Sequence, residues 1–192
     1  MKDKKLVFNY NKSYQVYRSN GKNRVILICD HASNYIPSKY KNLGLNKNQI
    51  QRHIAWDIGV AAVAKKLSKK LNATLIMSGY SRLLIDCNRP FGASEAFIKK
   101  SENTIIPGNL KLSKKEKKYR AKKFCIPYRN IISKIIKFRM KKNIIPIIVS
   151  LHSFTPIYKG SSRPWHLGLL YRREKRIFSL LDKELSKDKS IK

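Results

Sequence analysis

The chain has 192 residues, of which 42% are hydrophobic, so it is long and apolar enough for a domain with a core and is not a disordered protein. Its formal net charge is +32, from 43 Lys and Arg against 11 Asp and Glu. Such a charge attracts polyanions, but the lysines fall mostly on expected solvated helix faces, and a compositional bias explains them equally well. We therefore do not expect nucleic acid to be the main partner.

The cysteine pattern and the hydropathy favour a protein of the cytoplasm. Cys29, Cys87 and Cys125 show no paired spacing, which is typical of a reducing compartment. The N-terminus leads to no apolar signal segment, and no apolar stretch approaches the ~20 residues of a membrane span. No membrane partner is expected.

In chain order, residues 1–20 show no defined element, and the first clear one is a strand over 25–29. Its continuous apolar run is typical of a parallel strand covered on both faces. A short helix is predicted over 46–53, and a clearer helix begins at Asp57, a residue type that favours helix starts. The apolar face of that helix is expected to comprise Val60, Val63, Leu67 and Leu71.

The middle of the chain contains two further predicted strands, over 73–77 and 83–87. Residues 91–110 have no clear period and are predicted to form a long excursion that could act as a lid. Ser113 with Glu116 matches a capping box, which predicts the start of a lysine-rich helix. Pro127 is expected to interrupt that helix, because proline lacks the amide donor and its ring clashes with the preceding turn. A second helix is predicted to restart there, with Tyr128, Ile131, Ile135 and Phe138 on one face.

The last third of the chain is predicted to contain strands over 147–151 and 166–171 and a final helix. That helix carries Phe178, Leu181 and Leu185 on one side. Strands that alternate with helices indicate an α/β fold, here expected as a single domain over residues 1–192.

Two of the predicted strands run directly into a histidine, His31 after the first and His152 after the strand at 147–151. Ligands of open α/β sheets gather beyond the carboxyl ends of the strands. Two imidazoles with a carboxylate can hold a catalytic zinc, and Asp57 is the best-placed third ligand. The alternatives are that the histidines only cap backbone groups and that Asp57 only caps its helix. His53, four residues before Asp57, is a weaker candidate, and a structural hydrogen bond suffices for His166.

The segment from Tyr80 to Pro90 carries residues suited to anion binding. Arg82 and Arg89 offer forked donors that fit a carboxylate, and Asn88 adds a neutral donor. The alternative for Arg82 is an internal pair with Asp86. Arg163, in a later loop, could also reach a substrate carboxylate.

Six segments together resemble the N-formylglutamate amidohydrolase family, in the right order and over roughly residues 20 to 185. They are residues 30–34, 53–59, 80–90, 106–109, 150–154 and 163–168. The resemblance implies a three-layer αβα sandwich with a mostly parallel or mixed sheet, similar to zinc-dependent exopeptidases. It also implies metal-dependent hydrolysis of the amide bond of N-formyl-L-glutamate or a related acidic N-acyl amino acid.

The resemblance also implies site residues. His31, Asp57 and His152 match metal-site positions, with a divalent cation, Zn²⁺, as the cofactor. Asp57 and His53 are the candidates for a catalytic role. Arg82, Asn88 and Arg89 match positions that bind the substrate carboxylates, and Arg163 remains a candidate from its place in the later loop.

Two features depart from the family pattern. Arg129 stands where relatives often have a histidine. Relatives also continue to a late strand with a Glu-plus-Arg motif that holds the general base, so we expect a C-terminally truncated chain. One alternative function is therefore an impaired relative that only binds ligand. The other, suggested by the positive charge, is a basic nucleic-acid-binding protein.

Overall fold

The computed structural model describes residues 13–90, 92–158, 160–173 and 175–192. The chain divides into two compact units, Met1–Ser153 and Phe154–Lys192. The expectation of a single domain over residues 1–192 stays a prediction. Most of the predicted undefined N-terminal segment lies outside the described residues, but its last part forms a strand, β1 (Tyr14–Tyr17).

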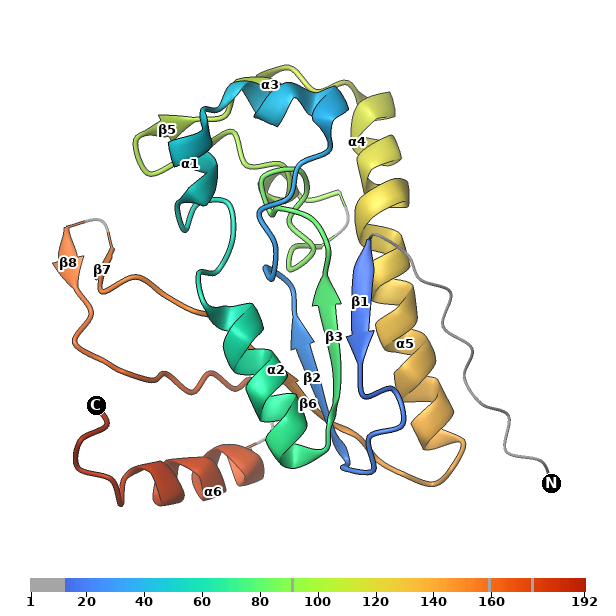
Figure 1. Ribbon diagram of the computed structural model, residues 1–192, viewed down its shortest axis with the longest axis vertical. Helices are drawn as coiled ribbons and strands as arrows, with labels where there is room; N and C mark the ends of the chain where they lie inside the picture. The colour runs from blue at the N-terminus through green and yellow to red at the C-terminus, as the bar shows by residue number, and fades with distance from the viewer. Residues whose placement is uncertain (1–12, 91, 159, 174) are drawn as a thin grey trace. The chain divides into compact units, whose positions relative to one another are not determined.

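The first unit is built on a four-stranded mixed sheet with the order β1-β3-β2-β6 (Figure 1). Strands β2 (Val25–Cys29), β3 (Thr74–Ser78) and β6 (Ile147–Ser150) run parallel, while β1 is antiparallel to β3. These bounds confirm the strands predicted over 25–29, 73–77 and 147–151 to within one residue. Together with the helices they confirm the α/β class.

The central strand β2 is covered on both faces, which explains its unbroken apolar run. Ile26 packs in a cluster with residues of helix α5 (Ile126–Met140), whereas Leu27 and Cys29 pack in a second cluster with helix α2 (Val60–Leu71). Strand β6 differs, because among the described residues it pairs only with β2 and leaves Ile148 48% exposed. The continuous apolar run over 147–151 also predicts burial on both faces, and for β6 that prediction is wrong.

Helix α2 begins three residues later than predicted. Its N-cap is Gly59, whose φ of 80° lies in the left-handed region that favours glycine. Asp57 consequently lies in the preceding loop, and the prediction that it opens the helix is wrong. The buried face consists of Val60, Ala64 and Ser68, while the Val63 side chain is exposed.

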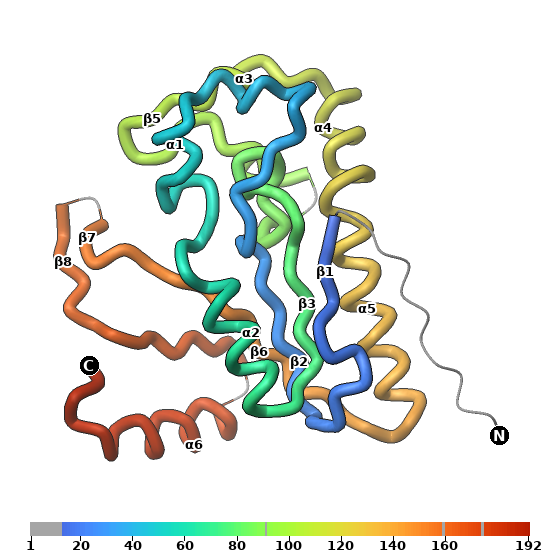
Figure 2. Tube along the Cα trace, in the orientation of Figure 1, coloured from blue at the N-terminus to red at the C-terminus, as the bar shows by residue number. Residues whose placement is uncertain are grey.

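Short irregular elements fill the region beyond the carboxyl ends of β2 and β3, as Figure 2 traces. They are η1 (Ser38–Gly44), α1 (Lys47–Gln51), η2 (Ser94–Ala96), the hairpin of β4 (Lys100–Ser101) and β5 (Thr104–Ile105), and α3 (Pro107–Leu110). Helix α1 confirms the short helix predicted over 46–53. Within the predicted excursion, Ala96, Phe97 and Ile106 are buried in the core, so much of it is packed structure.

The strand predicted over 83–87 is wrong, because side chains there bond to the backbone and form turns. The Ser81 hydroxyl accepts from the Leu83 amide at 3.2 Å, and the Asp86 carboxylate accepts from the Asn88 amide at 2.9 Å. Such local bonds compete with a strand ladder. The apolar residues of the segment are buried without being extended.

The helix predicted after Ser113 runs through the expected interruption. Helix α4 (Lys114–Arg120) continues through a π-helical segment, η3 (Ala121–Cys125), into α5, and the Ser113 side chain accepts from the Glu116 amide at its start. Pro127 lies in the first turn of α5, directly after the π-helical segment. The changed hydrogen-bond pattern there accommodates the missing proline donor, so the helical path does not break, and α5 starts next to the proline as predicted for the second helix.

The second unit contains a hairpin of β7 (Ile157–Tyr158) and β8 (Ser161–Ser162) and the helix α6 (Lys175–Leu185). Helix α6 confirms the predicted final helix. The strand predicted over 166–171 is wrong: no strand pairs with this segment among the described residues, and Leu170 is fully exposed. Throughout the described part of the chain, no helix has the length and apolarity needed to span a membrane.

Candidate metal centre

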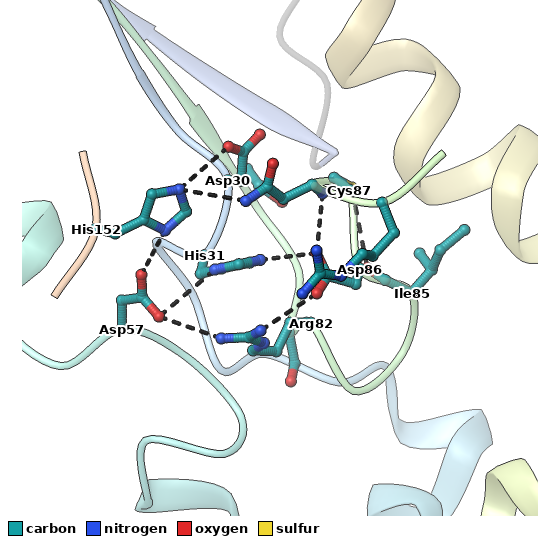
Figure 3. Close-up of polar contacts among 12 residues, drawn as sticks. Asp30, His31, Asp57, Arg82, Ile85, Asp86, Cys87 and His152 are labelled. Atoms are coloured by element: carbon teal, nitrogen blue, oxygen red, sulfur yellow. Dashed lines mark hydrogen bonds and ion pairs between the residues drawn. The ribbon is translucent and has the colours of Figure 1, made fainter. Parts of the chain in front are cut away.

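Three side chains from distant parts of the sequence meet beyond the carboxyl ends of β2 and β6 (Figure 3). They are His31, Asp57 and His152, and one potential ligand atom from each lies within 4.8 Å of the other two. The two imidazole rings have their centroids 5.0 Å apart. The structure thus brings together the three residues that the sequence analysis proposed as metal ligands.

The backbone accounts for this convergence. Strands β2 and β6 are parallel neighbours with Ile28 opposite Ser150, so the residues that follow them leave the sheet side by side. The Leu151 amide donates to the Ile28 carbonyl at 2.9 Å, which extends this pairing toward His152. The Asp57 amide donates to the His31 carbonyl at 3.0 Å and ties the loop before α2 to the end of β2.

His31 is held by a buried carboxylate. Its Nε2 lies 2.8 Å from Asp86 Oδ1, and the two side chains are 3% and 2% exposed. Burial lowers the pKa of His31, but hydrogen bonds to Asp57 and Asp86 outweigh burial and leave the pKa above its ordinary value. Asp86 accepts from Nε2. The other ring nitrogen, Nδ1, lies 3.5 Å from Asp57 Oδ1.

The His31 Nδ1 atom shows that the cluster fits a cation. This atom is buried, and among the described residues it has no hydrogen-bond partner closer than Asp57 Oδ1 at 3.5 Å. Two imidazoles with one carboxylate are a donor set of catalytic zinc sites. A carboxylate on the far nitrogen of a ligating histidine is also common in such sites, because it fixes the tautomer and the ring orientation.

His152 completes the cluster from a more open position, with its side chain 34% exposed. Its Nδ1 lies 2.8 Å from Asp57 Oδ2, and its Nε2 lies 3.2 Å from Ser150 Oγ and 3.7 Å from Asp30 Oδ2. Burial raises the pKa of Asp57, but hydrogen bonds from His152 and His31 outweigh it and hold the pKa well below its usual range. The Asp57 carboxylate is therefore ionised and available to a cation.

Arg82 lies beside both acidic groups of the cluster. Its Nη1 is 3.5 Å from Asp57 Oδ1, and its Nη2 is 3.3 Å from Asp86 Oδ2. Its Nε is buried and has no hydrogen-bond partner within the described ranges. The predicted internal pair with Asp86 is therefore present, and it places the guanidinium at the metal cluster.

The other residues proposed for substrate binding divide between the two units. Asn88 lies at the cluster, with its Nδ2 3.4 Å from His152 Nε2. Arg89 follows it and is exposed. Arg163 belongs to the second unit, where its guanidinium lies over the Tyr158 ring at 4.3 Å. His166 is in the same unit, and its Nδ1 accepts from the Lys192 amide at 3.1 Å, consistent with the structural role expected for it.

His53 contacts a different group. Its Nε2 lies 2.9 Å from Glu102 Oε1, next to an ion pair between Arg52 and the other oxygen of Glu102. His53 is not among the residues of the metal cluster. Its catalytic role stays a prediction.

Two acidic residues at the site were not selected from the sequence, Asp86 and Asp30. The available signal was an acidic residue next to an apolar run, because a buried carboxylate needs a partner.

Burial raises the pKa of neighbouring Cys29 to about 12, so this thiol stays protonated and is a poor ligand.

An ionised carboxylate between two imidazoles, at the carboxyl edge of an α/β sheet, is an arrangement typical of metal-dependent hydrolases. The comparison with protein families agrees with this class. The model of the N-formylglutamate amidohydrolase family matches residues 23–191, and the chain belongs to this family.

A solved structure with the same fold supports this assignment. A gene product from Agrobacterium tumefaciens, known from its crystal structure, is 37% identical and superposes with a TM-score of 0.90. The match covers 94% of this chain and 71% of that chain. No curated protein matches the chain significantly.

Proposed function

We propose that the protein is a metal-dependent amidohydrolase that hydrolyses the amide bond of N-formyl-L-glutamate or a related acidic N-acyl amino acid. The observation that carries the proposal is the convergence of His31, Asp57 and His152, with the buried Nδ1 of His31 facing the Asp57 carboxylate at 3.5 Å. Membership of the amidohydrolase family supports the reaction class. We also propose that the complete fold is a three-layer sandwich similar to that of zinc-dependent exopeptidases.

The three residues of the cluster would hold Zn²⁺. A bound zinc ion supplies a water of lowered pKa and polarises the carbonyl that is attacked. Asp86 keeps the His31 proton on Nε2, so that Nδ1 presents its lone pair. His152 Nδ1, which lies 2.8 Å from Asp57 Oδ2, would hold the cation through its lone pair, since ligating histidines bind through an unprotonated nitrogen.

We propose that Arg82 and Asn88 bind the acidic part of the substrate. Arg82 offers a forked donor at the edge of the cluster, and the Asn88 amide contacts His152. We propose that Arg89 and Arg163 bind substrate carboxylates as well. Each positive group would also favour the dianionic substrate over monoanionic N-acyl amino acids, whose side chain carries no charge.

Hydrolysis also needs a group that takes a proton from water and returns one to the leaving amine. Asp57 is ionised and partnered by two imidazoles, which suits it to hold the cation. A base role for His53 would fall to Nδ1, because Nε2 contacts Glu102.

The test uses the full chain loaded with Zn²⁺ and supplied with N-formyl-L-glutamate. We expect one bound zinc per chain and the release of formate and glutamate in equal amounts. N-formyl-D-glutamate and N-formyl-L-leucine serve as substrate controls and should react much more slowly. The Asp57→Asn variant should lose zinc, whereas Glu95→Gln, which changes an exposed carboxylate of the same unit, should retain it.

The outcomes separate the parts of the proposal. Full zinc occupancy in Asp57→Asn would contradict the metal centre. One bound zinc without release of formate would contradict the reaction. Tight binding of L-glutamate without turnover would instead support the ligand-binding alternative.

A further inference from the structure

The short segment that carries Asn88 is held from one side by an arginine of helix α5. Arg129 donates to the Cys87 carbonyl through Nε at 3.2 Å and through Nη2 at 2.7 Å. Its Nη2 also donates to the Arg89 carbonyl. One guanidinium thus binds the two carbonyls that flank Asn88.

The same segment is held from the other side by Asp86. The Asp86 Oδ1 atom accepts from the Asn88 amide at 2.9 Å and contacts His31 Nε2 at 2.8 Å. Asn88 therefore sits between a carboxylate that also orients a metal ligand and a guanidinium from a separate helix. Its side-chain amide projects to His152 Nε2 at 3.4 Å.

This segment depends on such contacts because it belongs to no strand or helix. A carbonyl outside regular structure needs a side chain or water as its partner. The planar guanidinium has several donors in a fixed fork and can bind two carbonyls at once, whereas a lysine presents one compact charge. The residue type at position 129 therefore matters for the shape of the segment.

The π-helical segment η3 contributes to the placement of Arg129. A π turn adds one residue to the helix and so rotates the following side chains by about 100° relative to an uninterrupted helix. With this register Tyr128 is buried in the core, and Arg129 beside it reaches the Cys87 carbonyl.

We propose that Arg129 is a positioning residue that sets the location of Asn88, and through it the affinity for the acidic substrate. The inference about affinity rests on the proposed function. The inference about the backbone of residues 87–89 stands on the hydrogen bonds alone. Arg129 acts through the two carbonyls and does not itself touch substrate.

The first experiment needs no turnover. Hydrogen exchange of the Asn88 and Arg89 backbone amides is compared among the full-length wild type, Arg129→Gln and Lys134→Gln. Lys134 is an exposed residue of α5, so its variant matches the loss of charge without touching the segment. Exchange should be about tenfold faster in Arg129→Gln, as expected for the loss of a net hydrogen bond, and unchanged in Lys134→Gln. Equal exchange in the wild type and Arg129→Gln would overturn the proposal.

If Arg129→Gln does not fold, Arg129→Lys replaces it. This variant keeps the charge but not the fork, and its exchange should lie clearly above the wild-type rate. A wild-type rate in a folded Arg129→Lys would likewise contradict the need for a guanidinium.

The second experiment measures KM and kcat of the zinc-loaded enzyme with N-formyl-L-glutamate. In Arg129→Gln, KM should rise about tenfold while kcat and the zinc content stay close to wild type, since substrate binding is weakened and the metal ligands are intact. Methylguanidinium should lower the KM of Arg129→Ala but not that of Asn88→Ala. An unchanged KM, or loss of zinc, would contradict the positioning role. If the wild type releases no formate, the proposed function fails, and the exchange experiment still decides the role of Arg129.

Discussion

The two imidazoles of the cluster are built in opposite ways. His31 follows a central strand, is buried, and binds the buried carboxylate of Asp86 at 2.8 Å. His152 follows the edge strand β6, and its side chain is 34% exposed. The difference indicates that one of the two proposed ligands is part of the core, whereas the other is the more accessible.

The largest expected effect is a difference in the free energy of unfolding between variants of the two histidines. In the metal-free protein, His31→Ala should lower the free energy of unfolding by about 3 kcal/mol, because it removes a buried partner of Asp86 and Asp57. His152→Ala should cost about 1 kcal/mol or less, since its contact with Asp57 is partly exposed. Urea unfolding measures both, and elemental analysis should show that both variants lose zinc. Equal destabilisation by the two substitutions would contradict the distinction between a buried His31 and a more accessible His152.

The next effect concerns the carboxylates behind the two rings. Asp86→Asn should weaken zinc binding by about 10- to 100-fold, the usual effect of losing a carboxylate that orients a ligating histidine. Asp30→Asn should weaken it less, because Asp30 lies 3.7 Å from His152 Nε2. Competition with a chromophoric chelator gives both affinities, with Glu95→Gln as the control. A larger loss in Asp30→Asn would mean that His152 is the more tightly oriented ligand.

The smallest expected effect comes from a third histidine. The pair of His53 and Glu102 is partly exposed, so His53→Gln should change the free energy of unfolding by about 1 kcal/mol or less and leave the zinc content unchanged. Turnover in the same variant tests the catalytic prediction. A general acid or base at this position requires a fall of about 100-fold or more at full zinc occupancy. A smaller fall would exclude that role.

The sequence predicts the three parallel strands and the cluster because burial and strand direction follow simple rules. The apolar run at β2 is buried on both faces, and parallel neighbours bring their carboxyl ends to one edge, which places His31 near His152. The same reasoning fails over residues 83–87, where an equally apolar run forms turns. An apolar run reports burial, and only the bonds of Ser81 and Asp86 to the backbone decide the conformation.

Asp57 illustrates why the details of the site were harder to predict. An aspartate before an amphipathic segment is typical of a helix cap, yet Gly59 caps α2 and leaves the carboxylate with the two histidines. The partnership of Asp86 with His31 joins residues 55 positions apart, and no local pattern encodes it. Tertiary contacts decide both cases.

The parallel register of β2 and β6 has a consequence for how this centre tolerates insertions. Adding one residue within either strand would advance its histidine by about 3.3 Å and turn the side chains beyond the insertion to the opposite face. The sheet could survive such a slip by re-pairing, but the imidazoles would no longer share a cation. A lengthening confined to the loops before these strands leaves the register intact, so natural length variation is expected there.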